Sequence, residues 1–124
     1  MGERILIVDD DPNILISLEY LMKREGFEVH LARDGEEALA AIAAQRPALV
    51  LLDVMMPKKS GLEVCQALRA DEALKDTRVL MLSAKARDTD IAKGLGSGAD
   101  AYMTKPFSTQ ALVQKVREML EARA

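Results

Sequence analysis

The sequence contains almost no cysteine or histidine. Cys65 is its one cysteine and His30 its one histidine. A single thiol cannot form an internal disulfide, which fits a reducing compartment, and this pair does not supply the ligands of a zinc site. Cys65 lies at helical spacing between Leu62 and Leu68, so we predict a small core residue there rather than a reactive thiol. His30 is expected to be an ordinary strand residue.

Long apolar segments and an excess of positive charge are also absent from the sequence. The first apolar run, residues 5–8, ends in three aspartates, and no run approaches the roughly 20 residues of a membrane-spanning helix. The net charge is −3. Because nucleic-acid binding needs a basic face, we expect no direct nucleic-acid partner. We also expect no membrane partner and a cytoplasmic location.

The size and composition are those of one globular unit. The chain has 124 residues, of which 49% are hydrophobic and 30% are charged. This length is that of one ordinary domain, and the composition differs from that of disordered chains. We find no internal repeat, linker or low-complexity segment, so residues 1–124 are predicted to form a single domain.

Five short apolar runs alternate with amphipathic segments along the chain. The runs predict strands at residues 5–8, 27–31, 48–52, 78–82 and 101–103. The segments between them predict helices, the first with Asp11 as its cap, Pro12 in its first turn and Gly26 at its end. Further helices are expected at residues 36–44, 62–69 and 88–95 and around residues 112–120. This alternation predicts an α/β fold with a doubly wound five-stranded parallel sheet, flavodoxin-like strand order 2-1-3-4-5 and helices on both faces.

Chemically active side chains follow four of the five predicted strands. Asp9–Asp11 end the first strand, Asp53 the third and Ser83 the fourth, and Lys105 comes just after the fifth. Taken singly, each has an ordinary explanation as a helix cap, a loop acid, a turn hydroxyl or a surface amine. In open α/β sheets, however, ligands bind beyond the carboxyl ends of the strands. Their joint placement predicts one site at that edge, while Asp11 by itself is best explained as a cap.

Crowded carboxylates at this edge favour a metal ion. Acids from two adjacent strands raise one another's pKa unless a cation lies between them. Oxygen ligands suit Mg²⁺, which completes its shell with water and phosphate oxygens. A carboxylate such as Asp53 beside this metal can accept a phosphoryl group, and Lys105 and the Ser83 hydroxyl are available to meet the charge on that group.

Four segments match a known family in the right order. They are IVDDD at 7–11, LDVMMP at 52–57, LSA at 82–84 and GADAYMTKPF at 98–107. With these segments the chain resembles the receiver domains of bacterial response regulators over essentially its whole length. The LysProPhe run after GlyAlaAsp is specific in this context, whereas the acidic pair alone is not.

The resemblance implies a role for each site residue. Asp53 would be the phosphoacceptor, and Mg²⁺ would be held by Asp9, Asp10, Asp53 and the Met55 backbone carbonyl. Ser83 and Tyr102 would be the switch residues, Lys105 would contact the phosphoryl group, and the Lys105–Pro106 bond would be cis.

The resemblance also implies partners and the kind of activity. A histidine kinase or a histidine phosphotransfer protein would supply the phosphoryl group. The face made by the fourth helix, fifth strand and fifth helix would control a partner or an output domain. The protein would not be an enzyme beyond Mg²⁺-dependent self-phosphorylation and self-dephosphorylation.

Two stretches depart from the family pattern. Residues 58–60, LysLysSer, replace the commoner small or acidic residues before Gly61. Ala111 stands near the start of the last helix, where many DNA-binding members carry an acid that pairs across a dimer. Lys115 and Arg117 remain on that helix. Without the acid these charges repel across a two-fold interface, so we predict a monomer.

Two other interpretations fit part of the sequence. The Asp9-x-Asp11 pattern also resembles Mg²⁺-dependent aspartyl phosphatases of the haloacid-dehalogenase type. Against this, Asn13 replaces the usual Thr or Val, no acidic pair ends the fourth strand, and no gating insertion is present. The remaining alternative is a receiver-like interaction module that is never phosphorylated, and the intact site residues argue against it.

Overall fold

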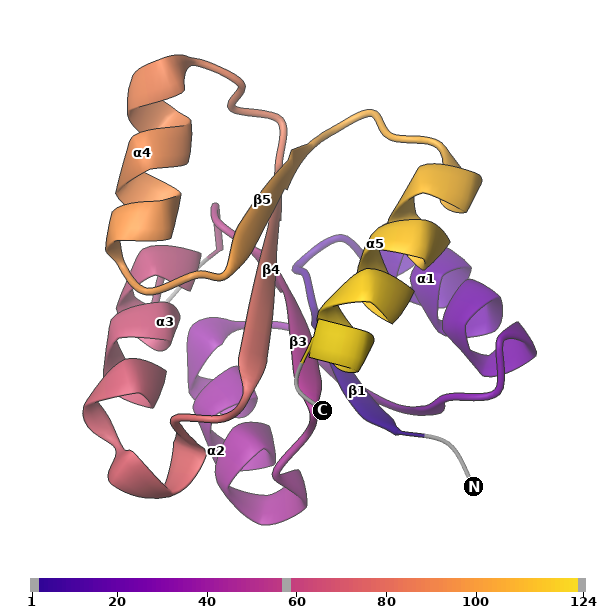
Figure 1. Cartoon of the computed structure of the whole chain (residues 1–124), viewed down its shortest axis with the longest axis horizontal. Coiled ribbons are helices and arrows are strands. Elements are labelled where there is room, and N and C mark those ends of the chain that lie inside the picture. Colours follow the sequence, from indigo (N-terminus) through magenta and orange to yellow (C-terminus); the bar gives the residue numbers. More distant parts are fainter. Residues whose placement is uncertain (1–2, 57–58, 123–124) are drawn as a thin grey trace.

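The computed structural model describes residues 3–56 and 59–122, so Pro57 and Lys58 of the segment after Asp53 lie outside the described residues. Strands and helices alternate along these residues (Figure 1). The strands are β1 (Arg4–Val8), β2 (Glu28–Ala32), β3 (Leu49–Asp53), β4 (Arg78–Ser83) and β5 (Ala101–Thr104). The helices are α1 (Pro12–Arg24), α2 (Gly35–Gln45), α3 (Gly61–Ala70), α4 (Asp88–Gly96) and α5 (Thr109–Ala122), with a short 3₁₀ helix η1 (Glu72–Leu74) after α3.

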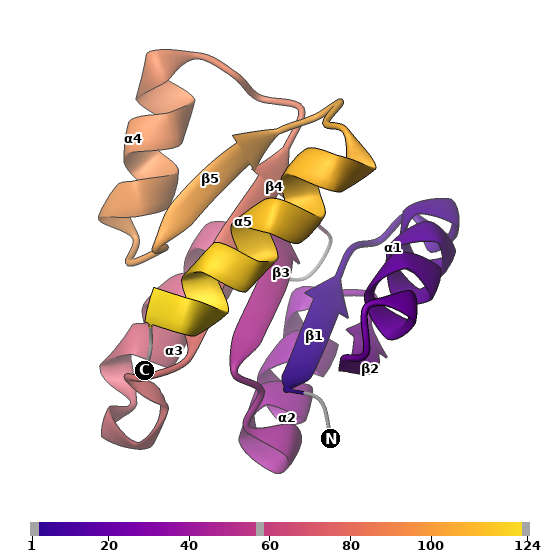
Figure 2. The same cartoon turned by 45° about the vertical axis from the view of Figure 1, so that its right-hand side comes forward.

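The five strands form one parallel sheet in the order β2-β1-β3-β4-β5, which confirms the predicted fold class and strand order. Figures 1 and 2 show α1 and α5 on one face of the sheet and α2, α3 and α4 on the other. Parallel strands need crossover connections, and helices packed on both faces provide them. The sheet is therefore covered on both sides, and its strand ends are left to form a site.

The continuous apolar runs are explained by burial on both faces. Every residue of β3 is buried. Its alternate side chains separate into two clusters, with Val50 and Leu52 packed under α2 and α3 and with Leu49 and Leu51 packed under α1 and α5. Cys65 belongs to the first cluster, and burial raises the pKa of its thiol. The expectation of an inert core cysteine is thus confirmed.

Most of the caps and turns that the sequence predicts are present in the structure. The Asp11 side chain accepts a hydrogen bond from the Asn13 N–H at 2.9 Å, and Pro12 opens α1. Gly26 has a φ of +94° and ends the turn after α1, a conformation that glycine adopts without strain. His30 lies in β2, and its ring contacts the Glu28 carboxylate at 2.8 Å.

Several strands begin or end at a different residue from the one predicted. The second strand begins at Glu28 rather than Phe27, because the Phe27 N–H still donates to the Met22 carbonyl at 3.2 Å. The third strand begins at Leu49 and includes Asp53. The short 3₁₀ helix η1 was not predicted, since three residues carry no periodic pattern. In the part of the chain that the structure describes, none of the helices is long and apolar enough to cross a membrane.

Candidate phosphoacceptor and metal site

Three carboxylates meet beyond the ends of two adjacent strands. Val8 of β1 lies beside Leu52 of β3 in the parallel register, so Asp9 and Asp53 follow side by side. Oxygen atoms of Asp9, Asp10 and Asp53 all lie within 4.8 Å of one another. Asp9 and Asp53 are buried and Asp10 is exposed, so the cluster opens to solvent on one side. The structure thus brings together the three acids that the sequence predicts.

Lys105 reaches this cluster from the far end of the chain. Its Nζ lies 3.0 Å from Asp9 Oδ2 and 3.7 Å from Asp53 Oδ1. The Lys105 backbone N–H donates to the Ser83 carbonyl at 2.8 Å, and the Lys105–Pro106 peptide bond is cis. The Lys105 side chain is 20% exposed, and its ammonium is directed at both acids. It therefore neutralises part of the negative charge of the cluster.

Backbone hydrogen bonds orient the acids. Asp9 Oδ1 accepts from the Asp11 N–H at 2.9 Å, and the Asp9 N–H donates to the Ala32 carbonyl at 3.2 Å. A backbone hydrogen bond from Met55 favours the ionised form of Asp53. Both buried carboxylates are therefore held by the chain segments that follow their strands, and the site is preorganised.

The environment of Asp53 disfavours its negative charge. Burial, and after it the neighbouring Asp9 charge, raise the pKa of Asp53, Lys105 lowers it, and the net result is a rise from 3.8 to about 6. Like charges in a poorly hydrated place cannot ionise together without cost, and a divalent cation relieves that cost. The three carboxylates offer the hard oxygen ligands that such a cation prefers. The cluster can accordingly bind a metal ion.

Ser83 and Tyr102 are linked through one residue of the loop after β4. Ser83 is buried at the end of β4, one residue past Leu82, which pairs with Asp53. Its Oγ accepts from the Lys85 N–H at 3.1 Å, and the Tyr102 hydroxyl donates to the Lys85 carbonyl at 2.9 Å. The two predicted switch residues therefore both bond to the backbone of Lys85, Ser83 at its N–H and Tyr102 at its carbonyl.

Gly61 is a site residue whose role the sequence analysis did not identify. Its N–H donates to the Val54 carbonyl at 2.9 Å, and a Cβ built on it would lie 2.4 Å from the Asp53 carbonyl oxygen. Only glycine permits this close approach, which folds the segment after β3 back onto Asp53. The glycine is visible in the sequence, but its distance to Asp53 depends on the loop path.

Comparisons with known proteins agree with this geometry. The family model of the response regulator receiver domain matches residues 5–117. The chain belongs to the response regulator receiver domain family. As a receiver domain of two-component response regulators, it is a signalling module and not a conventional enzyme. The aspartyl phosphatase alternative finds no support in these similarities.

Relatives of this receiver domain include two regulators of known name. It is 45% identical over 120 residues to the DNA-binding response regulator MtrA of Mycolicibacterium smegmatis, covering 97% of this chain and 51% of MtrA. It is 44% identical to the alkaline phosphatase synthesis transcriptional regulatory protein PhoP of Bacillus subtilis, covering 97% of this chain and 49% of PhoP. The receiver domain thus spans about half the length of these relatives.

Solved structures show the same fold. A response regulator from Chloroflexus aurantiacus J-10-fl has a TM-score of 0.93 and 35% identity, with 98% of this chain and 99% of that chain covered. The chemotaxis response regulator CheY4 of Vibrio cholerae has a TM-score of 0.91 and 30% identity, with 96% of this chain and 99% of that chain covered. These likenesses extend over nearly the whole receiver domain.

Proposed function

We propose that Asp53 accepts a phosphoryl group in a Mg²⁺-dependent reaction and that this modification switches the domain. The observation that supports this most directly is the placement of Lys105 Nζ between the carboxylates of Asp9 and Asp53. An ammonium already directed at Asp53 can stabilise charge on an incoming phosphoryl group without large rearrangement. Asp53 is also a buried acid whose negative charge its surroundings disfavour, which is typical of a group kept for chemistry.

Asp9, Asp10, Asp53 and the Met55 backbone carbonyl would hold Mg²⁺. The donor set fits, since the three carboxylates supply oxygen ligands within 4.8 Å of one another. When bound, Mg²⁺ supplies positive charge for the phosphate oxygens and screens the acids from one another. Asp53 forms the new O–P bond while the P–N bond of a phosphohistidine donor breaks and the imidazole keeps the electron pair. Lys105 then pairs with a phosphoryl oxygen.

Ser83 and Tyr102 would carry the signal away from Asp53. The Ser83 hydroxyl bonds the new phosphoryl oxygens and moves the loop that contains Lys85. Since the Tyr102 hydroxyl donates to the Lys85 carbonyl at 2.9 Å, movement of that loop changes the position of the ring. The result would be a changed surface on α4, β5 and α5.

The partners and setting follow from the resemblance to this family. A histidine kinase or a histidine phosphotransfer protein donates the phosphoryl group, and a downstream protein or output domain binds the α4–β5–α5 face. MtrA is named as DNA-binding, but with a net charge of −3 this receiver domain is proposed to make no direct nucleic-acid contact. We further propose that residues 1–124 form a single receiver domain, that it is a monomer, and that it works in the cytoplasm without a membrane partner.

Phosphorylation by a small donor tests the assignment of Asp53. Incubation with acetyl phosphate and Mg²⁺ should add the mass of one phosphoryl group, and Asp53→Asn should abolish the addition. Asp76→Asn is a matched control, because Asp76 is an exposed acid just before β4, away from the carboxyl ends of the strands. Equal labelling of wild type and Asp53→Asn would reject the acceptor. No labelling of wild type would favour the interaction module that is never phosphorylated.

A further inference from the structure

The ring of Tyr102 occupies space that a side chain at position 94 would need. Gly94 is buried in α4, which packs beside β5. A Cβ built on Gly94 would lie 2.6 Å from Tyr102 Cδ2, 2.8 Å from Tyr102 Cε2 and 3.0 Å from Met81 Sδ. Real Cβ atoms do not approach ring carbons this closely, because interiors are packed to the limit of atomic contact. The ring of Tyr102 therefore lies directly on the bare backbone of α4.

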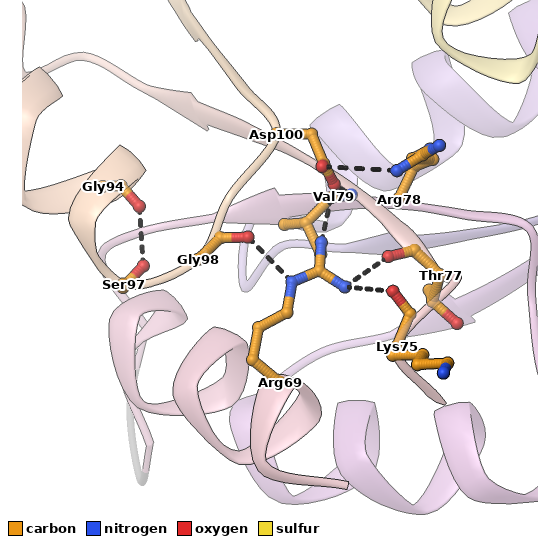
Figure 3. A network of polar contacts seen from close by, with 9 residues as sticks. All are labelled: Arg69, Lys75, Thr77, Arg78, Val79, Gly94, Ser97, Gly98 and Asp100. Atoms are coloured by element: carbon orange, nitrogen blue, oxygen red, sulfur yellow. Dashed lines mark hydrogen bonds and ion pairs between the residues drawn. The ribbon is translucent and has the colours of Figure 1, made fainter. Parts of the chain in front are cut away.

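The end of α4 next to Gly94 is fixed by polar contacts (Figure 3). Arg69 Nε donates to the Gly98 carbonyl at 2.8 Å, and Arg69 Nη2 lies 2.6 Å from Asp100 Oδ2. The Ser97 hydroxyl donates to the Gly94 carbonyl at 2.6 Å. Since Arg69 belongs to α3, its bonds tie the connection between α4 and β5 to a second helix, and Ser97 at the end of α4 bonds back to Gly94. The backbone at Gly94 is thus held by the Ser97 hydroxyl and by the anchored connection that follows the helix.

The other end of the ring is held by the loop after β4. The Tyr102 hydroxyl donates to the Lys85 carbonyl at 2.9 Å, and the Lys85 N–H in turn donates to Ser83 Oγ at 3.1 Å. Tyr102 also lines a cavity of about 160 Å³ together with Lys85 and Lys93. The ring therefore has room to move if it loses its place against α4, and a move breaks its hydroxyl contact with Lys85.

We propose that Gly94 is a positioning residue for the Tyr102 switch: the absence of a side chain at Gly94 lets the ring lie against α4 with its hydroxyl on Lys85. A methyl group at position 94 displaces the ring and disconnects Tyr102 from the segment that contacts Ser83. This inference rests on the proposed role of Tyr102 in switching. Gly94 itself touches neither the acids nor the phosphoryl group, and it acts only through the ring.

The chain offers a direct readout of the ring and a matched control. It contains no Trp and two Tyr, so Tyr20→Phe leaves Tyr102 as the single tyrosine fluorophore, and Tyr20 is 67% exposed on α1. Gly96 lies in the same helix as Gly94, and a Cβ on Gly96 meets nothing within 4 Å. In this background, Gly94→Ala should increase acrylamide quenching of Tyr102, whereas Gly96→Ala should leave it unchanged. Unchanged quenching in Gly94→Ala would overturn the proposal.

Thermal melts separate displacement of the ring from a general effect on the helix. Alanine favours a helix more than glycine does, so helix propensity alone predicts a higher melting temperature for both alanine variants. We expect Gly96→Ala to raise it and Gly94→Ala to lower it. Adding Tyr102→Ala should convert the loss at position 94 into a gain. If Gly94→Ala does not fold, recovery of folding by Tyr102→Ala supports the proposal and failure of that recovery rejects it.

The same samples distinguish this inference from the proposed function. Intact mass after acetyl phosphate treatment reports Asp53, and Tyr102 quenching before and after treatment reports the switch. In the Tyr20→Phe background, Gly94→Ala should still take up the phosphoryl group but lose the change in quenching that the Tyr20→Phe parent shows. A normal change in Gly94→Ala would overturn the positioning role. If wild type takes up no phosphoryl group, the proposed function fails, while quenching of the untreated proteins still decides whether Gly94 holds the ring in place.

Discussion

The charge of Asp53 is the main electrostatic cost at the residue scale. Asp53 is 6% exposed and its carboxylate faces Asp9, while one ammonium, Lys105, partly offsets the two acids. A structural acid would be paired so as to lower its pKa, as a salt bridge does. Here the pKa of Asp53 is instead raised to about 6, which is typical of a group kept for chemistry rather than for stability.

This raised pKa predicts how stability depends on pH in the metal-free protein. The folded state holds the Asp53 proton up to about pH 6, whereas an ordinary aspartate releases it at 3.8. The contribution of Asp53 to the free energy of unfolding is therefore fully present below pH 3.8 and is lost as the pH rises through about 6. We expect Asp53→Asn to raise the melting temperature well above pH 6 in a chelating buffer, with the gain disappearing below about 3.8.

Melting curves over this pH range check the prediction, with Asp76→Asn as the control for loss of a generic acid. A constant difference between wild type and Asp53→Asn at all pH values would contradict the assignment of the raised pKa to Asp53.

At the scale of elements, the start of α3 controls the shape of the site. Ser60 caps this helix by accepting from the Glu63 N–H at 3.3 Å, and Glu63 Oε1 accepts from the Ser60 N–H at 3.1 Å. This reciprocal pair satisfies donors that would otherwise have no partner at a helix end. Gly61, directly after the cap, lies against the Asp53 carbonyl. The helix start and the acceptor strand are therefore one packed unit.

Substitution at Gly61 should disturb this unit. In Gly61→Ala the new Cβ would lie 2.4 Å from the Asp53 carbonyl oxygen and 2.9 Å from Val54 Cα. Both neighbours are backbone atoms that cannot rotate away, so we expect a loss of about 1–3 kcal/mol in unfolding free energy, typical of overpacking. Urea denaturation measures this, with Gly96→Ala as the control in open space. Equal stability of the two variants would show that the loop after β3 adapts without cost.

At the scale of the whole molecule, metal binding should be coupled to folding. The carboxylates meet only in the folded chain, because Asp9 and Asp53 are 44 positions apart in the sequence. We expect Mg²⁺ to raise the unfolding free energy by about 1.4 kcal/mol once its concentration is roughly ten times the dissociation constant. Asp10→Asn should remove most of this gain and Asp76→Asn none of it. Melting temperatures measured across a Mg²⁺ titration decide the matter, and an indifferent wild type would count against the metal site.

The oligomeric state is the second property of the whole molecule that can be tested. Ala111 is exposed on α5. Arg117 of the same helix makes contacts within the chain, with Nη2 2.6 Å from Glu25 Oε1 and its guanidinium over the Phe27 ring. Neither residue offers an acid–base pair to a second copy, so we expect a monomer at micromolar concentration even after activation by beryllofluoride. Sedimentation velocity measures the mass. A shift to twice the monomer mass would show that this face dimerises by other contacts.

The local pattern of residues was sufficient to predict the fold of the receiver domain and the meeting of Asp9, Asp10 and Asp53 at one edge of its sheet. Continuous apolar runs indicated strands buried on both faces, and alternation with amphipathic segments indicated a parallel sheet with helices on either side. In such a sheet every strand carries its last residue to the same edge, so Asp9, Asp53 and Ser83 could be assigned to one edge before any coordinates. The observed boundaries of helices and strands differ from the predicted ones by a residue or two, because the ends of these elements depend on single hydrogen bonds.

Only the tertiary structure decided the close approaches on which the site depends. Lys105 Nζ lies 3.0 Å from Asp9 Oδ2 although 96 positions separate the two residues. The close approaches of Gly61 to Asp53 and of Gly94 to Tyr102 join consecutive elements, but they depend on how each connecting loop folds back. Such distances depend on strand register and on how each helix is rotated against the sheet, and both are set by the packing of the two hydrophobic clusters together. A sequence pattern names the residues on a face, whereas the packed core determines which of their atoms meet.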